Sequence, residues 1–150
     1  MSYIDKLIHN CQLAKNTFPI KEFELQNLSD LDNIDKAIYI IEEIDGDKNK
    51  TFNDFIQYRD KKERSCSKLN APSNILYVGS STSGIKKRLE QHIGNGHKST
   101  YALHLKYWFT GKYKIAIKQY NTTLDVLQII EDDLADRVKP AFGKQGGNNK

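Results

Sequence analysis

Two short apolar runs, each with one tyrosine inside it, constrain the fold of this chain more than any other feature. The first run is Ala37–Ile41 and the second is Ile75–Gly79. Both are rich in β-branched residues, a composition typical of strands that are buried on at least one face. A tyrosine in such a strand has to bring its hydroxyl to a hydrogen-bonding partner or use it in chemistry. The two runs therefore predict core strands in which Tyr39 and Tyr77 are candidate functional residues.

A turn rich in glycine and serine follows the second run, and a helix follows the turn. The turn lies at 80–84 and the helix is expected at about 83–93, because two glycines just after it are a strong stop signal. Arg88 and His92 are four residues apart, so they share one face of this helix beside its buried stripe. We expect both side chains to lie close to the turn after Tyr77.

A second long helix is predicted at 123–139, where apolar residues recur every three or four positions. Glu131 falls inside this apolar stripe, whereas the neighbouring acidic residues fall outside it. A carboxylate on a buried helix face is costly unless it is paired or binds a metal. Glu131 is therefore a candidate metal ligand, and an ion pair with an arginine at the edge of the core is the alternative.

The remaining segments complete one domain of the α/β (α+β) class with a small three-stranded central sheet. At 150 residues the chain is long enough for a single core. A third strand is predicted at 113–120 and a further helix at 100–109. Residues 1–33 form an N-terminal helical extension that caps the rest, in which Phe23 and Leu25 alternate with charged residues as in a short edge strand.

The order of these features resembles that of the GIY-YIG nuclease family. Ala37-Ile38-Tyr39 stands where the family has its first motif, and Tyr77-Val78-Gly79 stands where it has the second. Arg88 and Glu131 stand where the family has a helical arginine and a later helical glutamate. The resemblance covers roughly residues 34–149 and implies a mainly antiparallel sheet flanked by helices.

The end of the chain carries the last element of the resemblance. The family has an asparagine after a proline in this region, and Asn148 is preferred over Asn149 for this position. A flexible terminus is the alternative interpretation of this glycine-rich segment. Alanine replaces the first glycine of the family pattern and valine replaces an isoleucine. Neither change removes a catalytic group, so we predict an active enzyme.

The connection between the two tyrosine strands is longer than the short hairpin that the resemblance implies. Tyr39 and Tyr77 are 38 positions apart, so an insertion occupies about 45–74. A helix that begins near Thr51 carries basic residues toward its end: Arg59, Lys61, Lys62 and Arg64. One interpretation is a solvated helix whose cations complement the helix dipole. The other is an arm that contacts phosphates beside the active site.

The resemblance implies a metal-dependent DNA endonuclease that hydrolyses phosphodiester bonds, with one Mg²⁺ or Mn²⁺ per active site. Glu131 would hold the cation and Arg88 would neutralise charge on the phosphate oxygens. Tyr39, Tyr77 and His92 are the candidates for the general base. A phenol with a pKa of about 10 is a poor base at neutral pH, whereas an imidazole titrates in the right range. The choice among the three stays open.

The chain carries a moderate excess of positive charge, which is compatible with DNA as a partner. It has 23 Lys and Arg against 19 Asp and Glu. Five lysines are candidate DNA contacts, with general surface charge as the alternative: Lys61, Lys62, Lys86, Lys87 and Lys144. One such site cuts one strand, so double-strand cutting would need a homodimer or a partner protein. The second hypothesis is a nucleic-acid-binding module that has lost turnover, and the third is an unrelated small α/β protein.

Cysteine usage and hydropathy indicate the compartment. Cys11 and Cys66 lack the spacing of a metal or redox site, so we expect free thiols in a reducing environment. The N-terminal segment is interrupted by charges and does not read as a signal peptide. No stretch approaches the roughly 20 apolar residues of a membrane span. We therefore expect a cytoplasmic protein without membrane contact.

Overall fold

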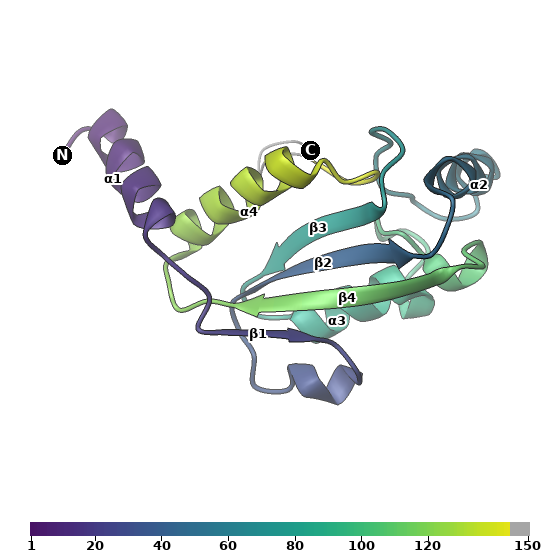
Figure 1. Ribbon diagram of the computed structural model, residues 1–150, viewed down its shortest axis with the longest axis horizontal. Coiled ribbons are helices and arrows are strands. Elements are labelled where there is room, and N and C mark those ends of the chain that lie inside the picture. Colours follow the sequence, from purple (N-terminus) through teal and green to yellow (C-terminus); the bar gives the residue numbers. More distant parts are fainter. Residues whose placement is uncertain (145–150) are drawn as a thin grey trace.

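The computed structural model describes residues 1–144 and contains a four-stranded antiparallel sheet with helices on both faces (Figure 1). Strand β2 (Ala37–Ile44) is central, with β3 (Ile75–Ser81) on one side and β4 (Lys112–Gln119) on the other. The short strand β1 (Lys21–Glu24) pairs with the outer edge of β4. The predicted mixed α and β class is confirmed. The prediction of three strands was wrong, because β1 is a fourth strand of the sheet.

Strand β1 is short and polar, which explains why three strands were predicted. Its single apolar residue, Phe23, is half-buried, whereas its other residues are exposed. The pairing with β4 is nevertheless regular, because each of its four residues has a partner on β4. Glu22 lies opposite Lys118 and forms an ion pair with it at 3.5 Å. Both side chains of such an exposed pair are solvated, so the pair contributes little stability.

The central strand supplies side chains to two separate cores, because successive residues of a strand point to opposite faces. Tyr39 belongs to the larger core. Helix α3 (Ile85–Glu90) covers this core, and helix α2 (Lys48–Asp60) contributes to it at the end of the sheet. Ile38 belongs to the smaller core on the other face, under α4 (Leu124–Val138). Figure 1 shows α4 along one face of the sheet and α3 across the other.

The long C-terminal helix has the bounds that its sequence predicts. The Thr123 side chain caps α4 by accepting a hydrogen bond from Val126 N at 3.3 Å. Lys139 ends the helix in the left-handed conformation, with φ of 50°. The predicted apolar stripe began at Leu124, which is exposed, whereas Val126 and Ala135 beside the stripe are buried, so the buried face is rotated slightly.

The predicted helix at 100–109 was wrong. Only a 3-10 turn at Leu105–Tyr107 forms, and His104 before it has a left-handed φ of 52°, which interrupts a continuous helix. Ala102 instead forms a parallel bridge with Cys66 of the insertion. The helix before this segment, α3, ends in a π-helical turn at Gln91–Asn95.

The helix of the insertion begins earlier than the sequence suggested. Asp47 caps α2, and its side chain accepts hydrogen bonds from the backbone of Asn49 and Lys50. Thr51, the predicted cap, lies one turn inside the helix. Its hydroxyl donates to the buried carboxylate of Glu43 at 2.7 Å, which ties α2 to the end of β2.

Helix α1 (Tyr3–Lys15) contacts the first turns of α4 but buries none of its own residues (Figure 1). The helix has an apolar face that is exposed, with Ile4 and Ile8 more than half accessible. The chain is completed by a 3-10 turn at Leu28–Leu31.

None of the helices within residues 1–144 is long and apolar enough to cross a bilayer. Both cysteines are free thiols.

Candidate active site

A pocket of about 230 Å³ brings together four of the predicted catalytic residues. Tyr39, Tyr77, Arg88 and Glu131 all line it, although they come from β2, β3, α3 and α4. The other lining residues are Val78, Gly79, Ser80, Gln128 and Lys144. We call this cavity the tyrosine pocket. Segments distant in sequence converge here, so the pocket exists only in the folded chain.

The register of the sheet places both tyrosines on the same face. Tyr39 lies opposite Gly79 and Tyr77 lies opposite Ile41, so the two rings are diagonal neighbours. Their planes are nearly parallel, at 4°, with centroids 6.0 Å apart. Gly79 leaves the space that the Tyr39 ring fills, because a Cβ at this position would overlap the phenol. Gly143, with φ of 100°, leaves room for the Tyr77 ring in the same way.

Arg88 reaches the pocket from α3 and holds the second tyrosine. Its Nη2 donates to the Tyr77 hydroxyl at 3.1 Å, and its Nη1 donates to Gln91 Oε1 at 3.0 Å. Arg88 forms no ion pair with an acidic side chain within residues 1–144. The alternative reading of Glu131, an ion pair with an arginine, is likewise not found in this part of the chain. The half-buried guanidinium therefore keeps its charge available to an anion in the pocket.

His92 is fully buried and fixes the first tyrosine. Its Nε2 lies 3.1 Å from the Tyr39 hydroxyl, and its Nδ1 accepts the backbone N–H of Leu103 at 3.2 Å. Burial, assisted by Arg88, lowers the pKa of His92 well below its usual value, so the ring is neutral. A neutral imidazole has one N–H, and since Nδ1 is an acceptor, Nε2 carries the proton and donates it to Tyr39. This arrangement favours a positioning role for His92 over the role of general base.

Tyr39 is subject to opposing influences. Burial, followed by the neighbouring Tyr77, raises the pKa of the Tyr39 hydroxyl above its usual value. The charge of Arg88 lowers the same pKa. An additional cation in the pocket would act in the direction of Arg88. The site therefore contains a phenol whose ionisation responds strongly to bound positive charge.

Glu131 is half-buried at the wall of the tyrosine pocket. Burial raises the pKa of its carboxyl, whereas hydrogen bonding from Ser80 and Gln128 opposes this rise. Carboxylate, hydroxyl and amide oxygens are the donors that a hard cation such as Mg²⁺ prefers, so these residues fit such an ion. No group of three or more His, Cys, Asp or Glu side chains suited to a metal occurs in the described part of the chain. Glu131 would therefore be the principal ligand, with substrate oxygens and water completing the coordination.

The other predicted contacts lie in different surroundings. All five predicted lysines are exposed: Lys61, Lys62, Lys86, Lys87 and Lys144. Lys144 lines the tyrosine pocket, whereas Lys86 forms an exposed ion pair with Asp32 at 3.2 Å. Lys62 lines a further pocket between the insertion and residues 98–101. Asn148 lies outside the described residues.

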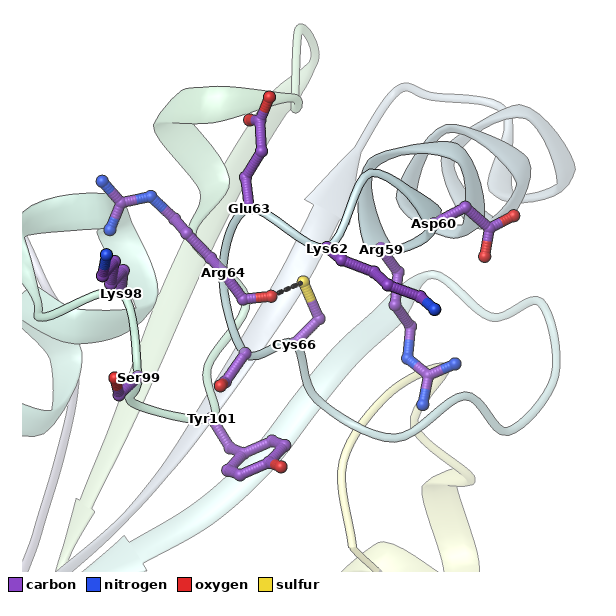
Figure 2. A pocket seen from close by; sticks show the side chains of 10 residues that line it. Arg59, Asp60, Lys62, Glu63, Arg64, Cys66, Lys98, Ser99 and Tyr101 are labelled. Carbon is purple, nitrogen blue, oxygen red and sulfur yellow. Dashed lines mark hydrogen bonds between the residues drawn. The ribbon is translucent and has the colours of Figure 1, made fainter.

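Two larger pockets extend from the tyrosine pocket toward the insertion, and sequence reasoning missed most of their lining. The nearer one, of about 760 Å³, we call the central pocket, and the farther one, of about 520 Å³, we call the distal pocket (Figure 2). Lys68, Lys98 and Tyr101 are lining residues that were not predicted. No local pattern marks them, because contacts between distant segments bring them together, among them the bridge between Cys66 and Ala102 and the hydrogen bond from Ser65 N to Lys98 O.

Several predicted residues thus meet at one place. Arg88 and His92 were expected close to the turn after Tyr77, and their side chains contact the two tyrosines themselves. The acidic, basic and phenolic groups share one cavity.

No family model, curated protein or solved structure matches the chain.

Proposed function

We propose that this protein is a metal-dependent endonuclease that hydrolyses DNA phosphodiester bonds in the tyrosine pocket. The observation that supports this most is the convergence of Glu131, Arg88, Tyr39 and Tyr77 on one cavity of about 230 Å³. Phosphodiester hydrolysis requires a base for the attacking water, positive charge for the phosphate oxygens and stabilisation of the leaving oxygen. The groups in the pocket can supply each of these. The resemblance to GIY-YIG nucleases leads to the same residues.

Arg88 is suited to the charge that builds on the phosphate. Its guanidinium is held by Tyr77 and Gln91, so it is already oriented before substrate binds. Oriented donors stabilise a developing negative charge without the cost of rearrangement. Glu131 would hold a divalent cation, Mg²⁺ or Mn²⁺, whose charge stabilises the leaving oxygen.

Tyr39 is the group that we assign as the base. The Nε2–H of His92 donates to its oxygen and the charge of Arg88 lowers its pKa, so both oppose the effect of burial and favour the phenolate over the phenol. The phenolate accepts the proton of the attacking water. Tyr77, which receives the hydrogen bond of Arg88, orients the water and the phosphate beside it. His92 holds Tyr39 in place and does not itself take the proton from water.

The second candidate function is a DNA-binding module of the same architecture without turnover. Burial raises the pKa of Tyr39, which keeps the phenol protonated and favours this alternative. The two functions share the DNA-binding surface and differ only in cleavage. They are separated by one assay.

The assay is cleavage of supercoiled plasmid in the presence of Mg²⁺. We expect the native protein to nick the plasmid, because one pocket cuts one strand, and Glu131→Gln or EDTA to abolish nicking. Asp133→Asn is the matched control, since Asp133 is exposed on the same helix and should leave activity unchanged. Binding without nicking by the native protein would support the second candidate. Nicking by Glu131→Gln would show that the tyrosine pocket is not the active site.

A further inference from the structure

The central and distal pockets adjoin the tyrosine pocket and form one path across the surface. Tyr77, Arg88 and Lys144 line both the tyrosine pocket and the central pocket. Arg59 and Tyr101 line both the central pocket and the distal pocket. We call the central and distal pockets together the basic groove. It begins at the proposed cleavage site and ends between the insertion and the loop at 98–101.

Positive side chains dominate this path. Together the three pockets are lined by seven Lys or Arg side chains and three carboxylates. Arg59, Lys68, Lys98 and Lys144 form no ion pair within residues 1–144. Figure 2 shows Asp60 directed away from Tyr101, with the Arg59 guanidinium between them. The charge of the groove is therefore available to an external polyanion.

Arg64 has a different role on the same path. Its guanidinium lies 4.0 Å from the centroid of the Tyr107 ring, and its Nη2 donates to the Tyr107 hydroxyl at 2.8 Å. Its Nη1 also reaches Gly96 O at 3.4 Å. These contacts hold the side chain against the protein, so Arg64 forms a wall of the distal pocket. Among the described groove residues, the cations that remain free to contact a ligand include Arg59, Lys68, Lys98 and Lys144.

Two features of the groove suit a nucleotide. Tyr101 is 68% exposed, although its ring borders both pockets. Ser67, by contrast, is only 4% exposed and lines the central pocket, and its hydroxyl has no hydrogen-bond partner among the residues that the structure describes. A buried polar atom without a partner is unfavourable unless a ligand or water satisfies it. The groove thus combines an open aromatic face with an unsatisfied hydroxyl.

We propose that the basic groove binds a single DNA strand that leads away from the tyrosine pocket. One base stacks on Tyr101, phosphates contact Arg59 and Lys68, and a base or sugar edge hydrogen-bonds to Ser67. Bases in a duplex are stacked on each other and cannot offer a face to Tyr101, whereas a single strand can. This inference rests on the proposed function. It specifies the substrate as DNA with a single-stranded segment next to the cleaved bond.

The test measures binding in EDTA, where cleavage plays no part. The probes are a fluorescein-labelled oligothymidine of about 15 nucleotides and a duplex of the same length, followed by fluorescence polarisation. Tyr101→Leu should weaken binding of the single strand by roughly tenfold, the effect of removing one stacking aromatic, and leave duplex binding unchanged. Tyr3→Leu is the matched control, because Tyr3 is exposed on α1.

Two further variants test the phosphate and hydroxyl contacts. Lys68→Ala should reduce the salt dependence of single-strand binding by about 0.7 in the log–log slope, whereas Lys6→Ala on α1 should not. Ser67→Ala should weaken binding while leaving the thermal unfolding temperature unchanged or higher, because the hydroxyl has no internal partner.

Each result supports or overturns the proposal. Equal effects of Tyr101→Leu on single strand and duplex would overturn it, as would a native protein that prefers the duplex. A native protein that binds the single strand through Tyr101 but cuts no substrate would uphold the groove and refute the endonuclease. The failure of one proposal is therefore distinguishable from the failure of the other.

Discussion

The Tyr39 side chain lies across Gly79 of the neighbouring strand and fills the space where a side chain of residue 79 would be. The two residues are direct partners in the pairing of β2 with β3. A Cβ on Gly79 would also come within 3.0 Å of the Tyr77 ring. The glycine of the second motif is therefore required by the first tyrosine. Its role is to let both rings lie parallel over the sheet.

Gly79→Ala should displace Tyr39 and abolish plasmid nicking. Forcing a methyl group into a filled core space costs about 1–3 kcal/mol, so the unfolding temperature should also fall. Gly84→Ala is the control, because an added Cβ at Gly84 has no atom within 4 Å. Nicking assays and thermal melts of both variants check this. Full activity in Gly79→Ala would show that the position of Tyr39 is unimportant for cleavage.

Much of the site follows from periodicity within single elements. The two tyrosine runs are strands because they are short apolar runs rich in β-branched residues, and Glu131 reaches the pocket because it follows Leu127 by one helical turn. Such patterns are local, so the sequence displays them directly. The role of Arg88 beside Tyr77 follows from its place on the next helix.

The features that sequence reasoning missed depend on contacts between distant segments. The hydrogen bond from Leu103 N to His92 fixes the tautomer, yet it joins a loop to the end of a helix. Tyr101 was expected within a helix because the residues around it are bulky and apolar. The bridge between Cys66 and Ala102 overrides that local preference, since it pairs the loop with the insertion. Tertiary pairing of this kind leaves no periodic signal.

The neutral, buried His92 should make the protein less stable in mild acid. Its pKa in the folded state lies below the unfolded value of about 6.5, so below that pH the unfolded chain binds a proton that the folded chain does not. This contribution is complete above about pH 6.5 and is lost as the pH falls toward the folded-state pKa. The free energy of unfolding should decline by up to about 1.4 kcal/mol per pH unit in this window.

Urea denaturation between about pH 7 and pH 5 measures this decline. The difference between the native protein and His92→Gln isolates the contribution of the imidazole. His97→Gln, at an exposed position, should keep the native slope. Parallel curves for the native protein and His92→Gln would mean that His92 binds a proton equally in the folded and the unfolded chain, and its assignment as a neutral donor to Tyr39 in mild acid would then be wrong.

Mg²⁺ should stabilise the native protein through Glu131. A ligand that binds only the folded state adds roughly 2.7 kcal/mol at a concentration a hundredfold above its dissociation constant. Since burial raises the pKa of Glu131, protons compete with the cation at a higher pH than for an ordinary glutamate. The stabilisation should therefore shrink as the pH falls through this raised pKa. Thermal melts with and without Mg²⁺ at several pH values measure the effect.

The matched variants for this experiment lie on the same helix. Glu131→Gln should remove the response to Mg²⁺ at every pH, whereas Asp133→Asn should retain it because this side chain is exposed. An equal response in native protein and Glu131→Gln would place the cation elsewhere.

Thr51 should hold the insertion on the sheet. Its hydroxyl is the donor to the Glu43 carboxylate, which is buried at the end of β2 with 6% exposure. Thr51→Val keeps the shape of the side chain and removes this donor. Hydrogen bonds to charged groups contribute about 1.5–3 kcal/mol, so the free energy of unfolding should fall by that amount. Thr110→Val, at an exposed threonine, should change it by less than about 0.5 kcal/mol.

A double-mutant cycle with Glu43→Gln separates the hydrogen bond from other effects of the substitution. Glu43→Gln removes the buried negative charge, so Thr51→Val should cost less in that background than in the native protein. The same hydrogen bond positions helix α2, which carries Arg59 at its end and so places it in the basic groove. Thr51→Val should therefore weaken binding of a single DNA strand more than binding of a duplex. Additive free energies in the cycle, together with unchanged DNA binding, would show that the insertion is held by its apolar contacts alone.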